Sequence, residues 1–172
     1  MFQMTPEATF YAILSENEPL AIAEIKGNKN HSGLQGFARF FRTPYSGLLL
    51  EIELYGLPDN PIDTSTQKEI SSTNMPHFYG MHIHENGDCT LPFDKTGNHW
   101  NPYQFPHPQH KGDLPPLISH NGYAFTIFYD ALLTLEEIAG RSLIIHAQPD
   151  DFTTQPSGNS GEKIGCGIIQ KI

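Results

Sequence analysis

The sequence predicts an all-β fold, an antiparallel sandwich or barrel with little helix. Short runs of alternating apolar and polar residues recur along the chain, turns rich in Gly, Pro, Asn and Ser separate them, and few segments have helical spacing. Counting these runs gives seven or eight short strands, a number typical of a sandwich or barrel. With 172 residues, 38% of them hydrophobic, the chain is long enough for one domain with its own core.

The N-terminal third is predicted to contain strands joined by short turns. The first expected strand has the least regular pattern, whereas the last, LLLEIELY, alternates clearly. These strands are expected at residues 8–15, 20–26, 33–41 and 48–55. The polar segment 56–76 has no periodicity and is predicted to be a loop or insertion without chemistry of its own.

The second half alternates strands with long loops. Strands are expected at residues 77–85, 122–129, 142–146 and 164–169, with one or two helical turns at 131–138. Almost nothing is periodic between residues 86 and 116, and a second polar loop covers 150–161. Ordered loops as long as the first are uncommon and usually functional, and a bound metal is one way to order such a loop.

The composition excludes some classes of partner. Ten Lys and Arg against nineteen Asp and Glu give a net charge of −9, which argues against nucleic-acid binding because phosphate contacts need a basic surface. No run of about 18 apolar residues is present, so no membrane partner is expected. The N-terminus lacks the pattern of a signal peptide. We therefore expect a cytoplasmic location, or a periplasmic or extracellular one if a leader was removed.

Two histidines of the segment GMHIHE are the first candidate metal ligands. His82 and His84 lie two positions apart in an extended run, so both imidazoles are expected on one face of a strand. A pair of surface histidines on an exposed strand is the alternative. His146 ends the apolar strand SLIIH, where a histidine is usually part of the core; with His82 and His84 it makes an imidazole-rich set that suits copper. A fourth nitrogen is needed, and a loop histidine could be shared.

The long loop carries a second candidate set. Three imidazoles and one carboxylate form a complete tetrahedral set for zinc, without the vacancy of a catalytic zinc site. These residues are His99, His107, His110 and Asp113. Four solvated loop side chains are the alternative, and a zinc hydrolase is disfavoured because no position is open. Cys89 and Cys166 could be free thiols or one long-range disulfide, and composition does not decide between them.

Five blocks of the sequence resemble one known family. GMHIHENGDC, GNHWNP, HKGDLPP, GRSLIIHAQPDD and SGNSGEKIGCGII are similar, in this order, to motifs of the copper/zinc superoxide dismutases. The resemblance runs from about residue 20 to residue 169 and is closest to bacterial members. It implies one domain over 1–172, an eight-stranded antiparallel Greek-key β-sandwich or barrel with long metal-binding loops. Residues 1–19 are then an N-terminal extension and 57–76 an insertion.

The resemblance also implies a set of metal ligands. Copper would be bound by His82, His84, His99 and His146, and zinc by His99, His107, His110 and Asp113, with His99 bridging the two ions. The implied reaction is copper-centred disproportionation of superoxide to dioxygen and hydrogen peroxide, with zinc purely structural. All seven ligand positions are filled, which favours an enzyme over the alternative, a non-catalytic dismutase-like protein that binds zinc or copper. The oligomeric state stays open, with a homodimer among the options.

Further roles follow only from the resemblance. Asp150 would accept N–H bonds from His82 and His107, although a solvated loop aspartate is the alternative. Cys89 and Cys166 would form a disulfide, which should stabilise the fold by roughly 4 kcal/mol in the chain-entropy model.

By the same resemblance, two further residues, Ser157 and Lys163, would line the channel to copper. Ser157 would stand at the channel mouth. Lys163 replaces an arginine of the family that guides the anion, and a lysine offers a point charge in place of a planar fork. We therefore expect Lys163 to support activity, but less of it than arginine would.

Overall fold

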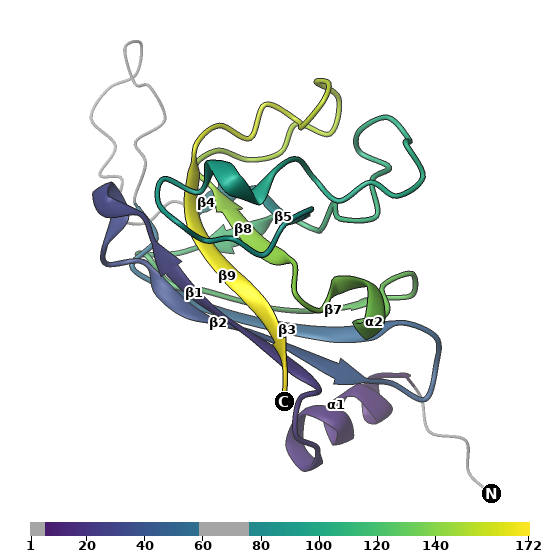
Figure 1. Cartoon of the computed structure of the whole chain (residues 1–172). Coiled ribbons are helices and arrows are strands. Elements are labelled where there is room, and N and C mark those ends of the chain that lie inside the picture. Colours follow the sequence, from purple (N-terminus) through teal and green to yellow (C-terminus); the bar gives the residue numbers. More distant parts are fainter. Residues whose placement is uncertain (1–5, 59–75) are drawn as a thin grey trace, which may run out of the picture.

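The computed structural model describes residues 6–58 and 76–172 of the chain. Within these residues, nine strands form two antiparallel sheets, accompanied by two short α-helices (Figure 1). The elements are α1 Pro6–Glu16, β1 Ala21–Gly27, β2 Gln35–Arg42, β3 Leu48–Tyr55, β4 His77–Tyr79, β5 Met81–His84, β6 Leu117–Ser119, β7 Ala124–Asp130, α2 Leu135–Ile138, β8 Ser142–His146 and β9 Lys163–Lys171, with the 3-10 helices η1 Lys29–His31 and η3 Asp94–Thr96. The predicted all-β antiparallel fold is confirmed.

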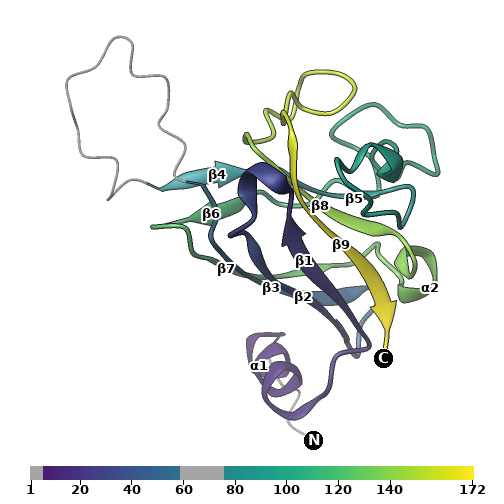
Figure 2. The same cartoon turned by 60° about the vertical axis from the view of Figure 1, so that its left-hand side comes forward.

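The larger sheet has the strand order β5-β8-β9-β1-β2-β3-β7, and it curls into a half-barrel (Figure 2). The smaller sheet pairs β4 with β6. One residue, Gly80, separates β4 from β5, so the strand predicted at 77–85 passes from one sheet into the other. Counting β4 and β5 as one strand gives eight strands; seven of them were predicted, and β6 Leu117–Ser119 was not.

The strand predicted at residues 8–15 was wrong, because this segment forms helix α1. Phe10, Ile13 and Leu14 recur at helical spacing and pack against Phe41 and Leu49. The strand interpretation weighed the β-prone residues of the segment and overlooked this period. The family resemblance began only after this segment, so it gave no guide.

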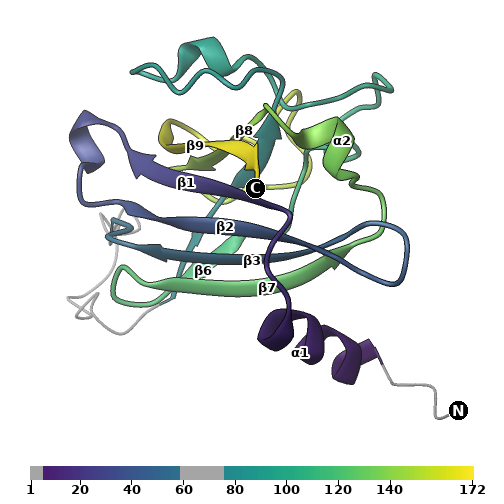
Figure 3. The same ribbon diagram turned by 60° about the horizontal axis from the view of Figure 1, so that its bottom comes forward.

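The two faces of the β2–β3 ladder have different coverage. Ala38, Phe40, Leu50 and Ile52 are fully buried in the main core, inside the curl of the sheet. Phe41 and Leu49 point the other way, and α1 covers them at one end of the outer face (Figure 3). Alternation along the strands thus fixes which side chains reach the core.

Two long loops, residues 85–116 and 147–162, lie on the same side of the molecule, beyond the ends of β5 and β8 (Figure 1). α2 confirms the helical turn predicted within 131–138. Most of the insertion predicted at 57–76, namely 59–75, lies outside the described residues. Among the described residues, no helix is long and apolar enough to cross a membrane.

Candidate metal centre

Strand β5 organises the site through its backbone. One edge pairs with β8, and the other bonds to two stretches of the long loop. His82 lies opposite Asp113, and His84 lies opposite His99. Ile83 N donates to Gly112 O, and Trp100 N donates to Ile83 O, each at 2.8 Å. The loop is therefore attached to the strand at the positions that carry candidate ligands.

Four histidines from β5, β8 and the long loop converge in the interior. His82, His84, His99 and His146 are all buried, and one ring nitrogen of each lies within 4.8 Å of the others. The structure thus brings together the set that the resemblance implied for copper. The pairing of β5 with β8 brings His146 beside His82 and His84, which lie more than sixty residues earlier in the chain.

A second set shares one histidine with the first. His99, His107, His110 and Asp113 also present donor atoms within 4.8 Å of one another. His99 Nδ1 lies 2.8 Å from Asp113 Oδ1, while the Nδ1 atoms of His107 and His110 lie 3.1 and 3.3 Å from Asp113 Oδ2. This is the tetrahedral set expected for zinc.

Backbone carbonyls fix which ring nitrogens face inward in the first set. His84 Nδ1 donates to Gly97 O at 2.9 Å, and His146 Nδ1 lies 3.2 Å from Gly161 O. With both protons on Nδ1, the two Nε2 atoms carry lone pairs, and these atoms lie only 3.3 Å apart. Two facing lone pairs repel each other unless a cation lies between them.

Other inward nitrogens make no hydrogen bond. Among the described residues, buried Nδ1 of His82 and Nε2 of His99 have no hydrogen-bond partner, and Nδ1 of His107 and His110 lie near Asp113 Oδ2 without hydrogen-bond geometry. Buried polar atoms are nearly always paired, so such a cluster of orphans needs an explanation. A metal ion in each set supplies it, and the donor types fit copper for the imidazole set and zinc for the mixed set.

Burial favours the neutral form of two imidazoles of the first set, His84 and His146. It lowers the pKa of His84 to about 2, with the neighbouring His146 ring adding to the effect. It also lowers the pKa of His146 to about 3, with His82 contributing. Only neutral imidazole has a lone pair to give, so these rings are poised to bind a metal at neutral pH.

Asp150 joins the two sets. Its Oδ2 lies 2.7 Å from His82 Nε2, and its Oδ1 lies 2.8 Å from His107 Nε2. Burial alone would raise the pKa of Asp150, but the bond from His82, the backbone N–H of Phe152 and the bond from His107 hold it well below its usual range. An ionised Asp150 accepts from both rings and leaves both Nδ1 atoms free for metal.

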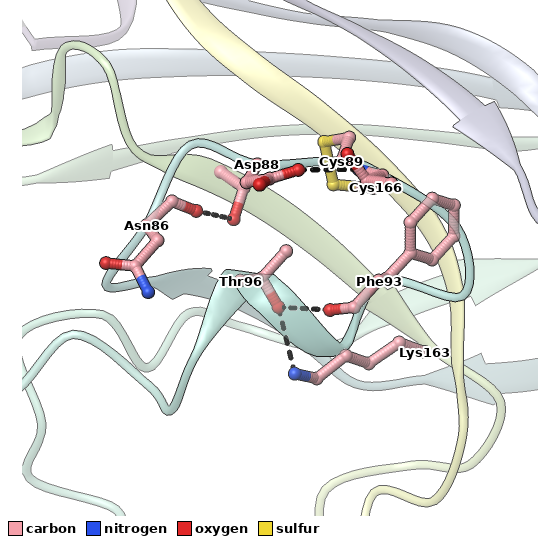
Figure 4. Close-up of a disulfide and its surroundings, with 9 residues drawn as sticks. Asn86, Asp88, Cys89, Phe93, Thr96, Lys163 and Cys166 are labelled. Atoms are coloured by element: carbon pink, nitrogen blue, oxygen red, sulfur yellow. Dashed lines mark hydrogen bonds between the residues drawn. A yellow bond between two sulfur atoms is a disulfide. The ribbon is translucent and has the colours of Figure 1, made fainter.

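A cavity of about 500 Å³ leads to the imidazole set. His84, His99, His146, Ser157 and Lys163 all line it. Lys163 Nζ donates to Thr96 Oγ1 at 2.9 Å (Figure 4), and it donates to Gly97 O at the same distance. Ser157 and Lys163 therefore border the same cavity as three of the four imidazoles.

The disulfide joins Cys89 of the long loop to Cys166 of β9, across 77 residues of sequence (Figure 4). Phe93 and Ile144 pack around it. It anchors to the sheet the same part of the loop that carries Thr96 and Gly97. The choice between free thiols and a disulfide is thereby resolved in favour of the disulfide.

Sequence reasoning missed three glycines at this site. The carbonyls of Gly97 and Gly161 orient His84 and His146, but a carbonyl group leaves no mark in a sequence. Gly158 has φ +66°, and a Cβ there would lie 1.9 Å from Asp150 Oδ1 and 2.7 Å from His107 Nε2. Only glycine leaves room for this carboxylate, and the Pro-Ser-Gly run at 156–158 was the available turn signal.

Comparisons with known proteins agree with this geometry. The family model "Copper/zinc superoxide dismutase (SODC)" matches residues 35–169, which begin after α1. A superoxide dismutase [Cu-Zn] of Deinococcus radiodurans is 35% identical over 136 residues, covering 66% of this chain and 74% of that protein. Superoxide dismutase [Cu-Zn] 2 of Aquifex aeolicus is 31% identical over 141 residues and covers 73% of each chain.

A solved structure supports the fold alone. The crystal structure of the clock protein EA4 superposes with a TM-score of 0.71, at 24% identity, over 91% of this chain and 97% of that one.

Proposed function

The chain belongs to the copper/zinc superoxide dismutase family, and from that membership we propose which of its side chains hold each metal. Copper takes the imidazole set, His82, His84, His99 and His146. Zinc takes the mixed set, His99, His107, His110 and Asp113. The single observation that carries the proposal is that two complete four-donor sets share His99.

The protein is a superoxide dismutase, converting two superoxide anions and two protons into dioxygen and hydrogen peroxide. When bound, copper supplies the centre that accepts one electron and then returns it, whereas zinc does not change oxidation state. The chain supplies everything else: the donors, their orientation, a cavity for the anion and positions for protons.

His99 is the residue on which proton handling depends. Its Nδ1 faces Asp113, and its unpaired Nε2 faces the other imidazoles at the base of the cavity. Nε2 is therefore the atom at which the chain can hold a proton beside the substrate. His99 Nδ1 belongs to the mixed set with Asp113, so the ring is held in place while Nε2 gains or loses that proton.

Lys163 attracts and positions the substrate. Among the described residues it is the only lysine or arginine that lines the cavity, where Glu85 partly offsets its charge. Two of its N–H groups are held by Thr96 and Gly97, and a lysine has three, so one stays available for an anion. We propose that superoxide is held between this N–H and the imidazole set.

Metal analysis together with a superoxide-consumption assay tests the proposal. The purified protein, loaded with both ions, should bind one copper and one zinc per chain and consume superoxide. The alternative, a non-catalytic metal-binding relative, predicts zinc uptake without turnover. Absence of activity at full copper occupancy would establish that alternative.

A further inference from the structure

A tryptophan on the zinc side of the centre is held by two cations. The Trp100 side chain is only 6% exposed, and Arg141 Cζ and Lys111 Nζ lie 4.6 and 5.3 Å from the centroid of its ring. Both distances are within the range of an effective cation–π contact. Together with Glu137, these three residues form what we call the tryptophan clamp.

Glu137 compensates the buried charge in the clamp. The Lys111 side chain is 9% exposed, and its Nζ lies 2.6 Å from each carboxylate oxygen of Glu137. Arg141 Nε donates to the backbone carbonyl of Glu137 at 2.7 Å. A buried ammonium needs such a partner, so the long loop is joined through Lys111 to α2. Neither the metals nor the cavity requires a lysine at this position.

The clamp touches the ligands through the backbone. Trp100 directly follows His99, and Lys111 directly follows His110. Gly112 N donates to Trp100 O at 2.9 Å, so the two clamp positions lie side by side across the loop. A backbone shift at Trp100 or Lys111 is therefore passed directly to the adjacent ligand, His99 or His110.

We propose that the tryptophan clamp is a positioning device, which holds His99 and His110 in ligand geometry and thereby slows the release of zinc. This inference rests on the proposed zinc site. It concerns retention of the ion and makes no use of copper or of turnover, so it can be tested separately from the dismutase activity.

Replacement of Lys111 by methionine tests the proposal in the full-length protein. Methionine keeps the apolar length of the side chain and removes its contact with Glu137. We expect zinc to pass from the loaded protein to a chromophoric chelator at least fivefold faster than from the wild type. The matched control is Lys95→Met in the same loop, since Lys95 is 67% exposed and makes only a 3.9 Å ion pair with Asp88. Its release rate should stay within twofold of the wild type.

Two further readouts distinguish positioning from general stability. Co²⁺ in place of zinc should give altered visible absorption bands in Lys111→Met, because these bands report ligand geometry. Lys111→Arg keeps a cation at this position, so its cobalt bands and its rate of zinc release should both be those of the wild type. Glu137→Gln provides a second, more exposed variant should Lys111→Met fold poorly. If the variants lower the melting temperature while zinc release and cobalt bands remain those of the wild type, the clamp is merely structural and the proposal is overturned. Faster zinc release in a protein that proves inactive with copper would support the clamp and contradict only the proposed function.

Discussion

The side chains of Lys163 and His84 meet on one atom, the carbonyl oxygen of Gly97, with Lys163 Nζ and His84 Nδ1 each 2.9 Å from it. The bond from His84 fixes the tautomer of a candidate copper ligand, and the bond from Lys163 fixes the position of the ammonium group in the substrate cavity. The disulfide anchors the loop that supplies this oxygen. Substrate guidance and ligand orientation therefore depend on the same short stretch of chain.

Lys163→Arg should raise the rate of superoxide consumption. A guanidinium has five N–H donors in a planar fork, so it can keep the contacts with Thr96 Oγ1 and Gly97 O and still offer a paired contact to an anion. The gain should be a few-fold and largest at low ionic strength, where charges are least screened. Rates measured between low and high salt check this. Lys26→Arg, on the exposed surface, serves as control; equal rates for Lys163→Arg and wild type at low salt would contradict the prediction.

His84→Ala should remove copper binding without removing zinc binding. Its ring belongs only to the imidazole set, so its loss should abolish copper-dependent turnover while His99, His107, His110 and Asp113 still retain zinc. Metal content after dialysis and a superoxide assay provide the measurement. His120→Ala removes an exposed histidine and should change neither. Loss of zinc together with copper from His84→Ala would show that the two sets are not independent.

Most of the site could be predicted because its ligands are side chains in motifs. The His-x-His spacing on a strand defined one half of the imidazole set, and the aperiodic loop rich in histidine defined the other set. Residue type and the periodicity of apolar residues are local properties, and both can be read from a single sequence. The same holds for the strands at 48–55 and 142–146, whose patterns alone predicted them.

What could not be predicted depends on tertiary contacts or on the backbone. The carbonyls of Gly97 and Gly161 orient ligands, and any residue type carries a carbonyl. Helix α1 did leave a local signal, the helical spacing of Phe10, Ile13 and Leu14, but their partners Phe41 and Leu49 lie outside residues 8–15. The tryptophan clamp joins Trp100 to Arg141, which lies far away along the chain, and no periodic pattern of residues indicates this contact.

Asp150→Asn should lower the affinity of the protein for both copper and zinc. The carboxylate accepts an N–H from His82 with one oxygen and from His107 with the other. An asparagine has one acceptor oxygen, so its NH₂ group would face the N–H of one ring. Loss of such a hydrogen bond to a ligand typically costs 10- to 100-fold in affinity. Competition with chelators for each metal checks this. Asp151→Asn is the control, because Asp151 is exposed and contacts only its own turn; an effect confined to one metal would contradict the shared role.

The metal-free protein should lose stability when the pH falls below about 6.5. The pKa of His84 is about 2 in the folded protein and that of His146 about 3, against 6.5 for an unperturbed histidine. Between these values the unfolded chain binds more protons than the folded one, so lower pH favours unfolding. The groups that face these two rings are His82, His99 and Lys163, and their charges oppose protonation further. The lowered pKa values of Asp113 and Asp150 act in the same direction, but only below about pH 4, where unfolded carboxylates take up protons.

Urea unfolding of the metal-free protein between pH 7 and pH 5 measures this effect. Two histidines that stay neutral when folded, His84 and His146, should together lower the free energy of unfolding by roughly 4 kcal/mol over this range. Burial also lowers the pKa of His82, which adds to the effect in the same direction. The metal-loaded protein should change much less, because a coordinated nitrogen cannot take up a proton until the ion leaves. His84→Ala removes one of these groups and should lose roughly 2 kcal/mol of the pH dependence. If the metal-free variant shows the same pH dependence as the metal-free wild type, burial of His84 is not its source, and another group must take up the protons.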